Sequence, residues 1–255
     1  MLMKTLKDSK VMFLRNMKIS FRNPETTAMA IIAPTMIMLL FVYVFGGVMD
    51  VGEDISYVNF IIAGITLQCI AQGSVTTAIN INLDMKRGMV DRFRSMPISK
   101  ASFLIGHSAA AVVRNIITAS LIIFVAFAVG FRPEANFVQW LIMTAMFLLF
   151  ILVINWLAIL VGLLSKTAES ASSLVSFIAV LPYVSSGFAP TERMPAGIRW
   201  FAENQPITPI INTIRAMITG TSAGNNAYIA LAWCFGLLAV MFGLSLYFYR
   251  RRTSA

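Results

Sequence analysis

The sequence has few of the residues from which catalytic and metal-binding centres are built. Its 255 residues include one histidine, His107, and two cysteines, Cys69 and Cys234, which both lie inside apolar runs. A histidine pair is therefore impossible, and we expect neither a disulfide nor a metal site. The phosphate-binding pattern G-x-x-x-x-G-K-[ST] is absent too. We expect a chain that is not an enzyme and holds no cofactor of its own.

Charge is also scarce, at 12% of the residues, whereas hydrophobic residues make up 58%. This composition differs from that of soluble globular domains and predicts an integral membrane protein. The few acidic residues lie nearly all in loops, which argues against a proton-driven carrier built on buried carboxylates. The basic residues lie in loops beside apolar runs, as they do in membrane proteins, where they set the orientation. We therefore expect no nucleic-acid partner.

Six apolar stretches are long enough to cross a bilayer as helices, since one span needs about 20 residues. They cover residues of about 26–48, 57–79, 103–131, 138–164, 168–188 and 227–249. Residues 1–255 are thus expected to form one all-α integral membrane domain. Pro34 is expected to kink the first span, and Pro182 to kink or break the fifth.

Two further segments predict helices that do not cross the membrane. Residues 2–22 place basic side chains on one side of a helix and apolar ones on another. That pattern fits a helix in the membrane interface, attracted by anionic lipid, and a solvated basic tail is the alternative. Residues 187–224 are too polar and too rich in proline to cross, and they predict short re-entrant or surface helices between the fifth and sixth spans.

The distribution of basic residues predicts the orientation. With both termini and residues 81–107 inside, fifteen basic residues lie on the cytoplasmic side of the six spans and four on the outer side. Cytoplasmic loops of membrane proteins carry the excess of lysine and arginine. We therefore expect a multi-pass protein of the cell membrane with both termini in the cytoplasm.

The second predicted span carries a stripe of polar side chains. Gln68, Gln72 and Thr76 stand four residues apart and share one face of a helix. Polar side chains within a span rarely face lipid. These residues therefore either hold helices together or line a wet pathway, and the sequence leaves both interpretations open.

The most informative stretch is a charged island at residues 81–107, INLDMKRGMVDRFRSMPISKASFLIGH, which holds five basic residues and two aspartates. Gly88 and Pro97 oppose a single helix through it, so we expect two short amphipathic pieces with a turn near Met96. An ordinary positively charged loop would satisfy the same pattern. The other interpretation is a docking element that receives force from a cytosolic protein.

The island resembles the cytoplasmic coupling segment of ABC-2 type permeases, in particular the daunorubicin-resistance-like multidrug exporters. The resemblance is carried by GMVDRFRSMPISKASFLIGH at residues 88–107. A second stretch, FAENQPITPIINTIRAMITG at residues 201–220, resembles the segment before the last span of those permeases. The order of the elements along the whole chain is similar as well.

Site residues follow from the resemblance by position. It implies a coupling element that includes Gly88, Asp91, Arg92, Phe93, Arg94, Pro97 and Ile98. It implies that the second and fifth spans face a central cavity, with Gln68, Gln72, Thr76, Ser173 and Ser176 as candidates for its lining. The helix at residues 2–22 would be the elbow or connecting helix of the family.

The resemblance also implies a function. The chain would be the permease subunit of an ATP-driven exporter, embedded among membrane lipids and paired with a second, identical protomer. Two copies of a separate cytosolic ATPase, which bind the ATP and magnesium, would dock on the 81–102 loop. The expected cargo is a small amphiphilic compound, drug or lipid-like. The alternatives are a permease for polysaccharide or lipid-linked glycan, and a membrane sensor subunit without transport.

Overall fold

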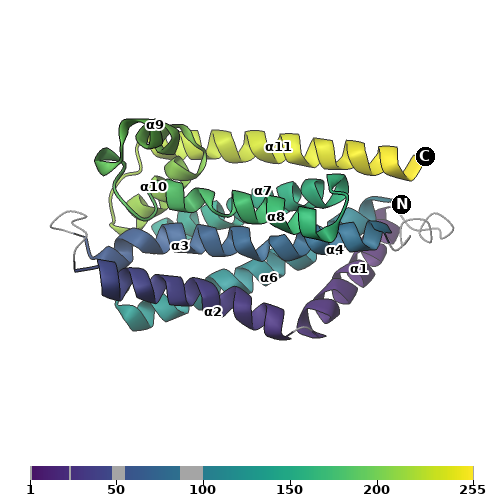
Figure 1. Cartoon of the computed structure of the whole chain (residues 1–255), viewed down its shortest axis with the longest axis horizontal. Coiled ribbons are helices and arrows are strands. Elements are labelled where there is room, and N and C mark those ends of the chain that lie inside the picture. The colour runs from purple at the N-terminus through teal and green to yellow at the C-terminus, as the bar shows by residue number, and fades with distance from the viewer. Residues whose placement is uncertain (1, 23, 48–54, 87–99, 255) are drawn as a thin grey trace.

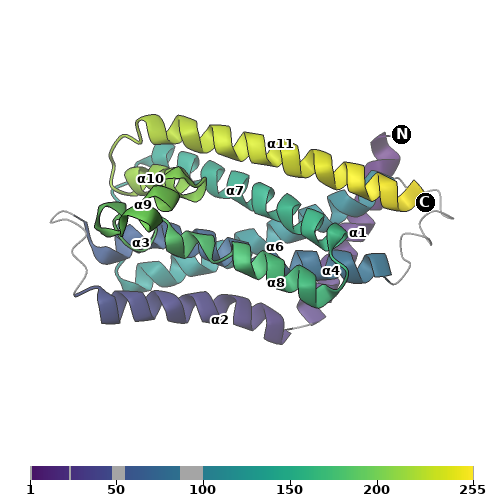
Figure 2. The same ribbon diagram turned by 45° about the horizontal axis from the view of Figure 1, so that its top comes forward.

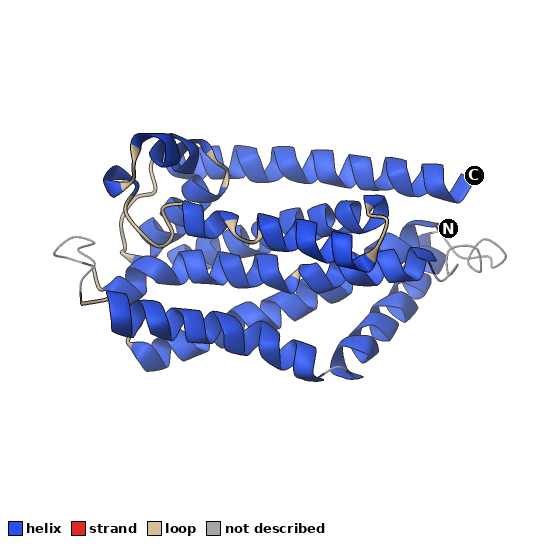
Figure 3. Cartoon of the chain, in the orientation of Figure 1, coloured by secondary structure: helices blue, strands red, loops and turns tan. Residues whose placement is uncertain are grey.

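The structure, a computed structural model, describes residues 2–22, 24–47, 55–86 and 100–254. All regular elements within these ranges are helices, as Figure 3 shows, so the predicted all-α class is confirmed. The helices form an elongated bundle (Figure 1). Both chain ends lie at one end of this bundle, beside the end of α4 (Val75–Lys86) and the start of α6 (Lys100–Val129).

The first helix, α1 (Leu2–Arg22), coincides with the predicted surface helix. It is inclined to the other helices and packs mainly on α6 (Figure 2). The two helices approach closely at Gly106, where an added Cβ atom would lie 2.4 Å from the Cβ of Met12. The chain continues in α2 (Pro24–Leu40), which runs through Pro34 and on into a short π-helix, η1 (Phe41–Phe45).

The centre of the bundle is a helical run that is interrupted at Ser74, between α3 (Tyr57–Gly73) and α4. The Ser74 backbone N–H donates to the carbonyls of Ile70 and Ala71, and its hydroxyl also donates to Ile70. Nearly every side chain of α3 is buried. A helix that is apolar on all sides is expected in such a central position.

Capping residues fix the starts of the next two helices. Asn136 and Gln139 form a reciprocal capping box at the start of α7 (Phe137–Leu164), and Thr167 and Ser170 form one at the start of α8 (Ala168–Ile178). Each box satisfies backbone N–H groups that a helix start leaves without partners. Both helices pack against α4, so this side of the central run is covered.

The fifth predicted span, 168–188, is shorter as a regular helix than the sequence indicates. The α-helix ends at Ile178, and the chain passes into a 3₁₀ helix, η2 (Leu181–Val184). Pro182 explains the break, because it has no N–H to donate to the Ile178 carbonyl and its ring disfavours helical backbone at the residue before it.

Short helices follow, as predicted for residues 187–224. They are η3 (Thr191–Arg193), α9 (Ala196–Asn204) and α10 (Ile207–Ile218). Most of α10 is buried, packed against α3, α7 and the last helix, α11 (Asn225–Ser254), whereas α9 leaves its large apolar side chains exposed. The turn before η3 meets α3 at two glycines: a Cβ atom on Gly64 would lie 2.8 Å from the Cα of Gly187.

Four helical runs of the described residues are long and apolar enough to cross a membrane: Tyr57–Lys86, Ser102–Val129, Phe137–Leu164 and Asn225–Arg252. The first and fifth predicted spans correspond to shorter apolar runs, Ile31–Phe45 and Ala168–Val184. These findings agree with an integral membrane protein. Six crossings, and cytoplasmic termini, stay predictions.

Candidate functional site

Four cationic or titratable side chains lie where α1 crosses α4 and α6. We call this cluster the polar junction: Arg15, Asp84, His107 and Arg114. Arg15 donates from both terminal nitrogens to the two carboxylate oxygens of Asp84, at 2.8 and 2.9 Å. His107 Nε2 lies 3.1 Å from the same carboxylate. Asp84 thus joins three helices that are far apart in the sequence.

The contacts of Asp84 favour its ionised form, a carboxylate. Its side chain is only 6% exposed, and a bidentate arginine is the strongest partner for a buried carboxylate. The hydrogen bonds with Asp84 in turn raise the pKa of Arg15 above its ordinary value. Because an ionised carboxylate only accepts, Nε2 of His107 carries the proton of their shared hydrogen bond.

Arg114 extends the polar junction along α6. It donates to the hydroxyl of Thr77 on α4 at 2.8 Å and to that of Ser20 on α1 at 3.3 Å. Its Nε is buried and has no hydrogen-bond partner among the described residues. Arg114 is thus hydrogen-bonded to two neighbouring helices.

Buried asparagines attach α7 to the same helices. Asn155 on α7 donates to the hydroxyl of Ser108 on α6 at 2.8 Å. Asn82 on α4 donates to the carbonyl of Ser165, just after α7, at 2.7 Å. Together with the polar junction, these bonds hold the end of α4 and the start of α6, the two helices that flank residues 87–99. A displacement of that segment would therefore act on four helices.

The predicted coupling residues all fall within 87–99, outside the described residues: Gly88, Asp91, Arg92, Phe93, Arg94, Pro97 and Ile98. Their role stays a prediction. The structure does place the two flanks of the segment, which lie at the same end of the bundle as both termini (Figure 1).

The predicted pathway residues occupy different environments. Gln68 is buried in α3, and its side-chain oxygen has no hydrogen-bond partner in the described part of the chain. Gln72, one turn later, is exposed, and Thr76 is partly exposed. On α8, which packs on α3 and α4, Ser173 is exposed and Ser176 partly exposed. Gln72, Thr76 and the two serines are thus at least partly accessible in the single chain, and their role stays a prediction.

Two arginines, Arg15 and Arg215, make buried or partly buried contacts that the sequence does not indicate. Nothing in it distinguishes Arg15 from the other basic residues of its helix as the partner of Asp84. Arg215 on α10 is one of four outer basic residues in the sequence, yet its guanidinium donates to the backbone carbonyls of Phe60 and Ser186. The available signal is the helical spacing of Arg215 from the buried Ile211 and Ile218.

Residues 220–224, GTSAG, have the G-x-S-x-G spacing of a hydrolase nucleophile. The motif requires a turn between a strand and a helix, with a histidine nearby. Here it lies between two helices, and the Ser222 hydroxyl accepts from the N–H of Gly224. The one histidine is held by Asp84 near the start of α6. This stretch is therefore not a nucleophile elbow.

Comparison with known proteins points to one kind of membrane protein. The daunorubicin resistance ABC transporter permease protein DrrB1 of Streptomyces coeruleorubidus is 26% identical over 227 residues, which cover 88% of this chain and 79% of the relative. The probable doxorubicin resistance ABC transporter permease protein DrrC of Mycobacterium tuberculosis is 23% identical over 219 residues, 86% of this chain and 79% of the relative. Residues 8–219 match the model of the ABC-2 type transporter family. The chain belongs to this family.

Proposed function

We propose that the chain is the transmembrane permease subunit of an ATP-driven exporter for a small amphiphilic compound. A separate cytosolic ATPase docks on the 81–102 loop and supplies the energy. A second copy of the chain completes the transport pathway. The cargo is drug-like or lipid-like, in keeping with the names of the two relatives.

The observation that carries this proposal is the family match, which includes the whole 81–102 loop. The arrangement of the bundle supports it. Helices α4 and α6 lead into and out of residues 87–99 at one end, and the polar junction ties both helices to α1. A force on the loop would thus be passed to the helices by buried, charge-assisted hydrogen bonds rather than lost in a mobile connection.

The exposure of Gln72, Thr76, Ser173 and Ser176 supports the placement of the pathway. These side chains lie at least partly exposed on α3, α4 and α8, in spans rich in apolar residues. Polar side chains that face lipid are costly. A second protomer packed against α3, α4 and α8 would shield these side chains from lipid and form a polar route between the two copies.

The proposed function predicts dependence on a partner. We expect the purified chain to hydrolyse no ATP above background, and to co-purify with an ATPase when it is extracted gently from its own cells. ATP hydrolysis by the chain and by the co-purified complex, each reconstituted in lipid, provides the measurement. Robust hydrolysis by the isolated chain would contradict the proposal.

A second expected result concerns Gln72. We expect Gln72→Leu to change the order in which a panel of amphiphiles is exported, with no loss of stability, because the side chain is exposed in the single chain. Gln68→Leu is the matched control: the same substitution one turn away, at a buried position, should leave that order unchanged. Transport assays and thermal unfolding of the assembled complex measure both effects. An unchanged order for Gln72→Leu would exclude Gln72 from the pathway.

A further inference from the structure

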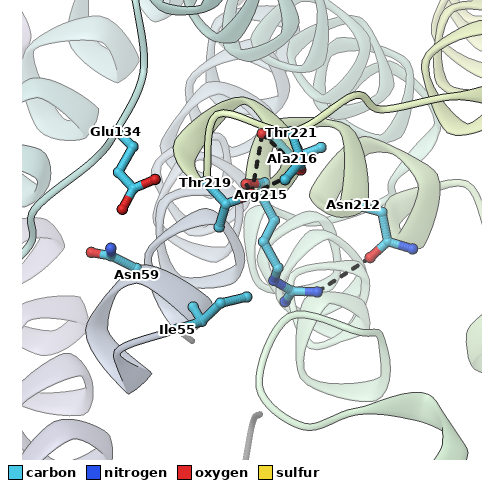
Figure 4. Close-up of a pocket in the computed structure, with 8 residues that line it drawn as sticks. All are labelled: Ile55, Asn59, Glu134, Asn212, Arg215, Ala216, Thr219 and Thr221. Carbon is cyan, nitrogen blue, oxygen red and sulfur yellow. Dashed lines mark hydrogen bonds between the residues drawn. The ribbon is translucent and has the colours of Figure 1, made fainter. Parts of the chain in front are cut away.

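A cavity of about 630 Å³ lies at the end of the bundle opposite the chain ends. It is bounded by the start of α3, by the connection between α6 and α7, and by the last turns of α10 (Figure 4). Most of the residues that line it are of polar type: Ile55, Asn59, Glu134, Asn212, Arg215, Ala216, Thr219 and Thr221. Small-molecule sites in proteins have volumes of about 300–1,000 Å³, so this cavity is large enough for a ligand.

One wall of the cavity carries the positive charge of Arg215, which is partly buried. Arg215 donates from Nε and from one terminal nitrogen to the carbonyl of Phe60, and also to the carbonyl of Ser186 and the side-chain oxygen of Asn212. Its guanidinium lies 3.7 Å from the centre of the Phe60 ring. These are neutral partners. Among the described residues no carboxylate lies within ion-pair distance of Arg215, although the charge of Glu192 acts on it from farther away.

The opposite wall carries a negative charge. Glu134 is exposed, and its carboxylate forms no ion pair within the described ranges of the chain. Its backbone is held in place, because its N–H donates to the carbonyl of Ile218 at 2.9 Å. Asn59 steadies the same connection by two hydrogen bonds with the backbone of Arg132, at 2.8 and 3.0 Å. Figure 4 shows Glu134 and Asn59 across the cavity from Arg215 and Asn212.

Opposite charges thus face one cavity without contacting each other. A purely anionic ligand would bring a second negative charge to Glu134, and a purely cationic one would add a positive charge beside Arg215. A ligand that carries one negative and one positive charge can pair with Arg215 on one wall and with Glu134 on the other. The cavity also lies at the starts of α3 and α7 and the end of α6. These helices belong to runs that are long and apolar enough to cross a membrane, and a helix that crosses ends near the level of the lipid headgroups.

We propose that this cavity binds the headgroup of a zwitterionic phospholipid with a primary ammonium group, such as phosphatidylethanolamine. The phosphate faces Arg215, which has five N–H groups and uses four of them in the bonds described above. The ammonium group donates to the carboxylate of Glu134. The hydroxyls of Thr219 and Thr221 line the space between the two charges. This site is separate from the proposed transport pathway on α3, α4 and α8.

The test uses the full chain in detergent and two short-chain lipids, dihexanoyl-phosphatidylethanolamine and dihexanoyl-phosphatidylglycerol. We expect saturable binding of the first, measured by native mass spectrometry and by a rise in melting temperature, and clearly weaker binding of the second, which lacks the ammonium group. Glu134→Gln should weaken binding of the ethanolamine lipid by about ten-fold or more, because the amide can still accept a hydrogen bond but no longer carries the negative charge that attracts the ammonium group. Glu134 is exposed, so the variant should fold normally.

Glu203→Gln is the matched control, since it removes the same charge from an exposed residue that does not line the cavity. It should leave lipid binding unchanged. Equal binding of the two lipids, equal effects of the two substitutions, or no saturable binding at all would each overturn the proposal. Free phosphoethanolamine that binds more tightly than the lipid would assign the site to a soluble molecule and would overturn it as well.

Discussion

Replacing Asp84 with asparagine is expected to destabilise the protein by about 3 kcal/mol, near the lower end of the range for breaking a buried ion pair. The carboxylate accepts from both terminal nitrogens of Arg15 and contacts His107, and an amide cannot accept from all three. The 29% exposure of the Arg15 side chain lets water solvate part of its charge, which keeps the cost from being larger. Transport should fall as well, because α1 loses its main polar attachment to α4.

A denaturant titration of the purified protein measures this change, and a double-mutant cycle isolates the pair. Arg15→Met should also destabilise, but the two substitutions together should cost about 1–3 kcal/mol less than their sum, since they remove the same interaction. Lys18→Met is the control, because Lys18 is an exposed base on the same helix. Additive effects of the two substitutions would mean that the pair does not contribute to stability.

Reversing two charges in the island, Arg92→Glu and Arg94→Glu together, is expected to abolish most of the transport while the protein inserts in the membrane as before. Both residues belong to the proposed coupling element, where they would face an ATPase. Orientation should survive, because the remaining basic residues still favour the same sides of the membrane. The measurements are co-purification of the ATPase, transport, and the amount of protein in the membrane.

Lys166→Glu with Arg252→Glu provides the comparison for this double variant. Both residues are exposed, and both are predicted to lie on the cytoplasmic side, so the change in net charge is the same. Transport should remain near normal in the comparison variant. Normal transport at normal abundance in the Arg92/Arg94 variant would show instead that the island is an ordinary positively charged loop.

Much of the fold was predictable because hydropathy is a local property of the sequence. The helix at residues 2–22 was predicted at its observed bounds, the helix predicted at 138–164 differs by one residue from the observed one, and Pro182 was predicted to kink or break the fifth apolar stretch. The central run extends to Lys86, beyond the predicted end at residue 79, because polar residues such as Asn82 and Asp84 are satisfied by neighbouring helices. Hydropathy cannot show that these polar side chains have hydrogen-bond partners, because the partners lie elsewhere in the chain.

The candidate site was less predictable for the same reason. Arg15 was predicted only as one base of a helix attracted by anionic lipid, although it binds Asp84, 69 residues away. The prediction that Gln68, Gln72 and Thr76 share one face assumed a single regular helix. In the structure Gln68 is buried, and the helix is interrupted at Ser74. A contact between distant residues, and the side of a helix that a neighbour covers, are tertiary properties.

The crossing of Gly64 and Gly187 limits how this sequence can change. The two residues are far apart in the chain, yet their backbones share one space, and a Cβ atom at position 64 would lie 2.8 Å from backbone atoms of Gly187. Backbone cannot yield as the tip of a flexible side chain can, so a methyl group at position 64 requires the turn before η3 to move away from α3. That turn also supplies the Ser186 carbonyl to Arg215. A larger residue at position 64 in the central helix would therefore displace one of the groups that hold the guanidinium of Arg215 at the wall of the cavity.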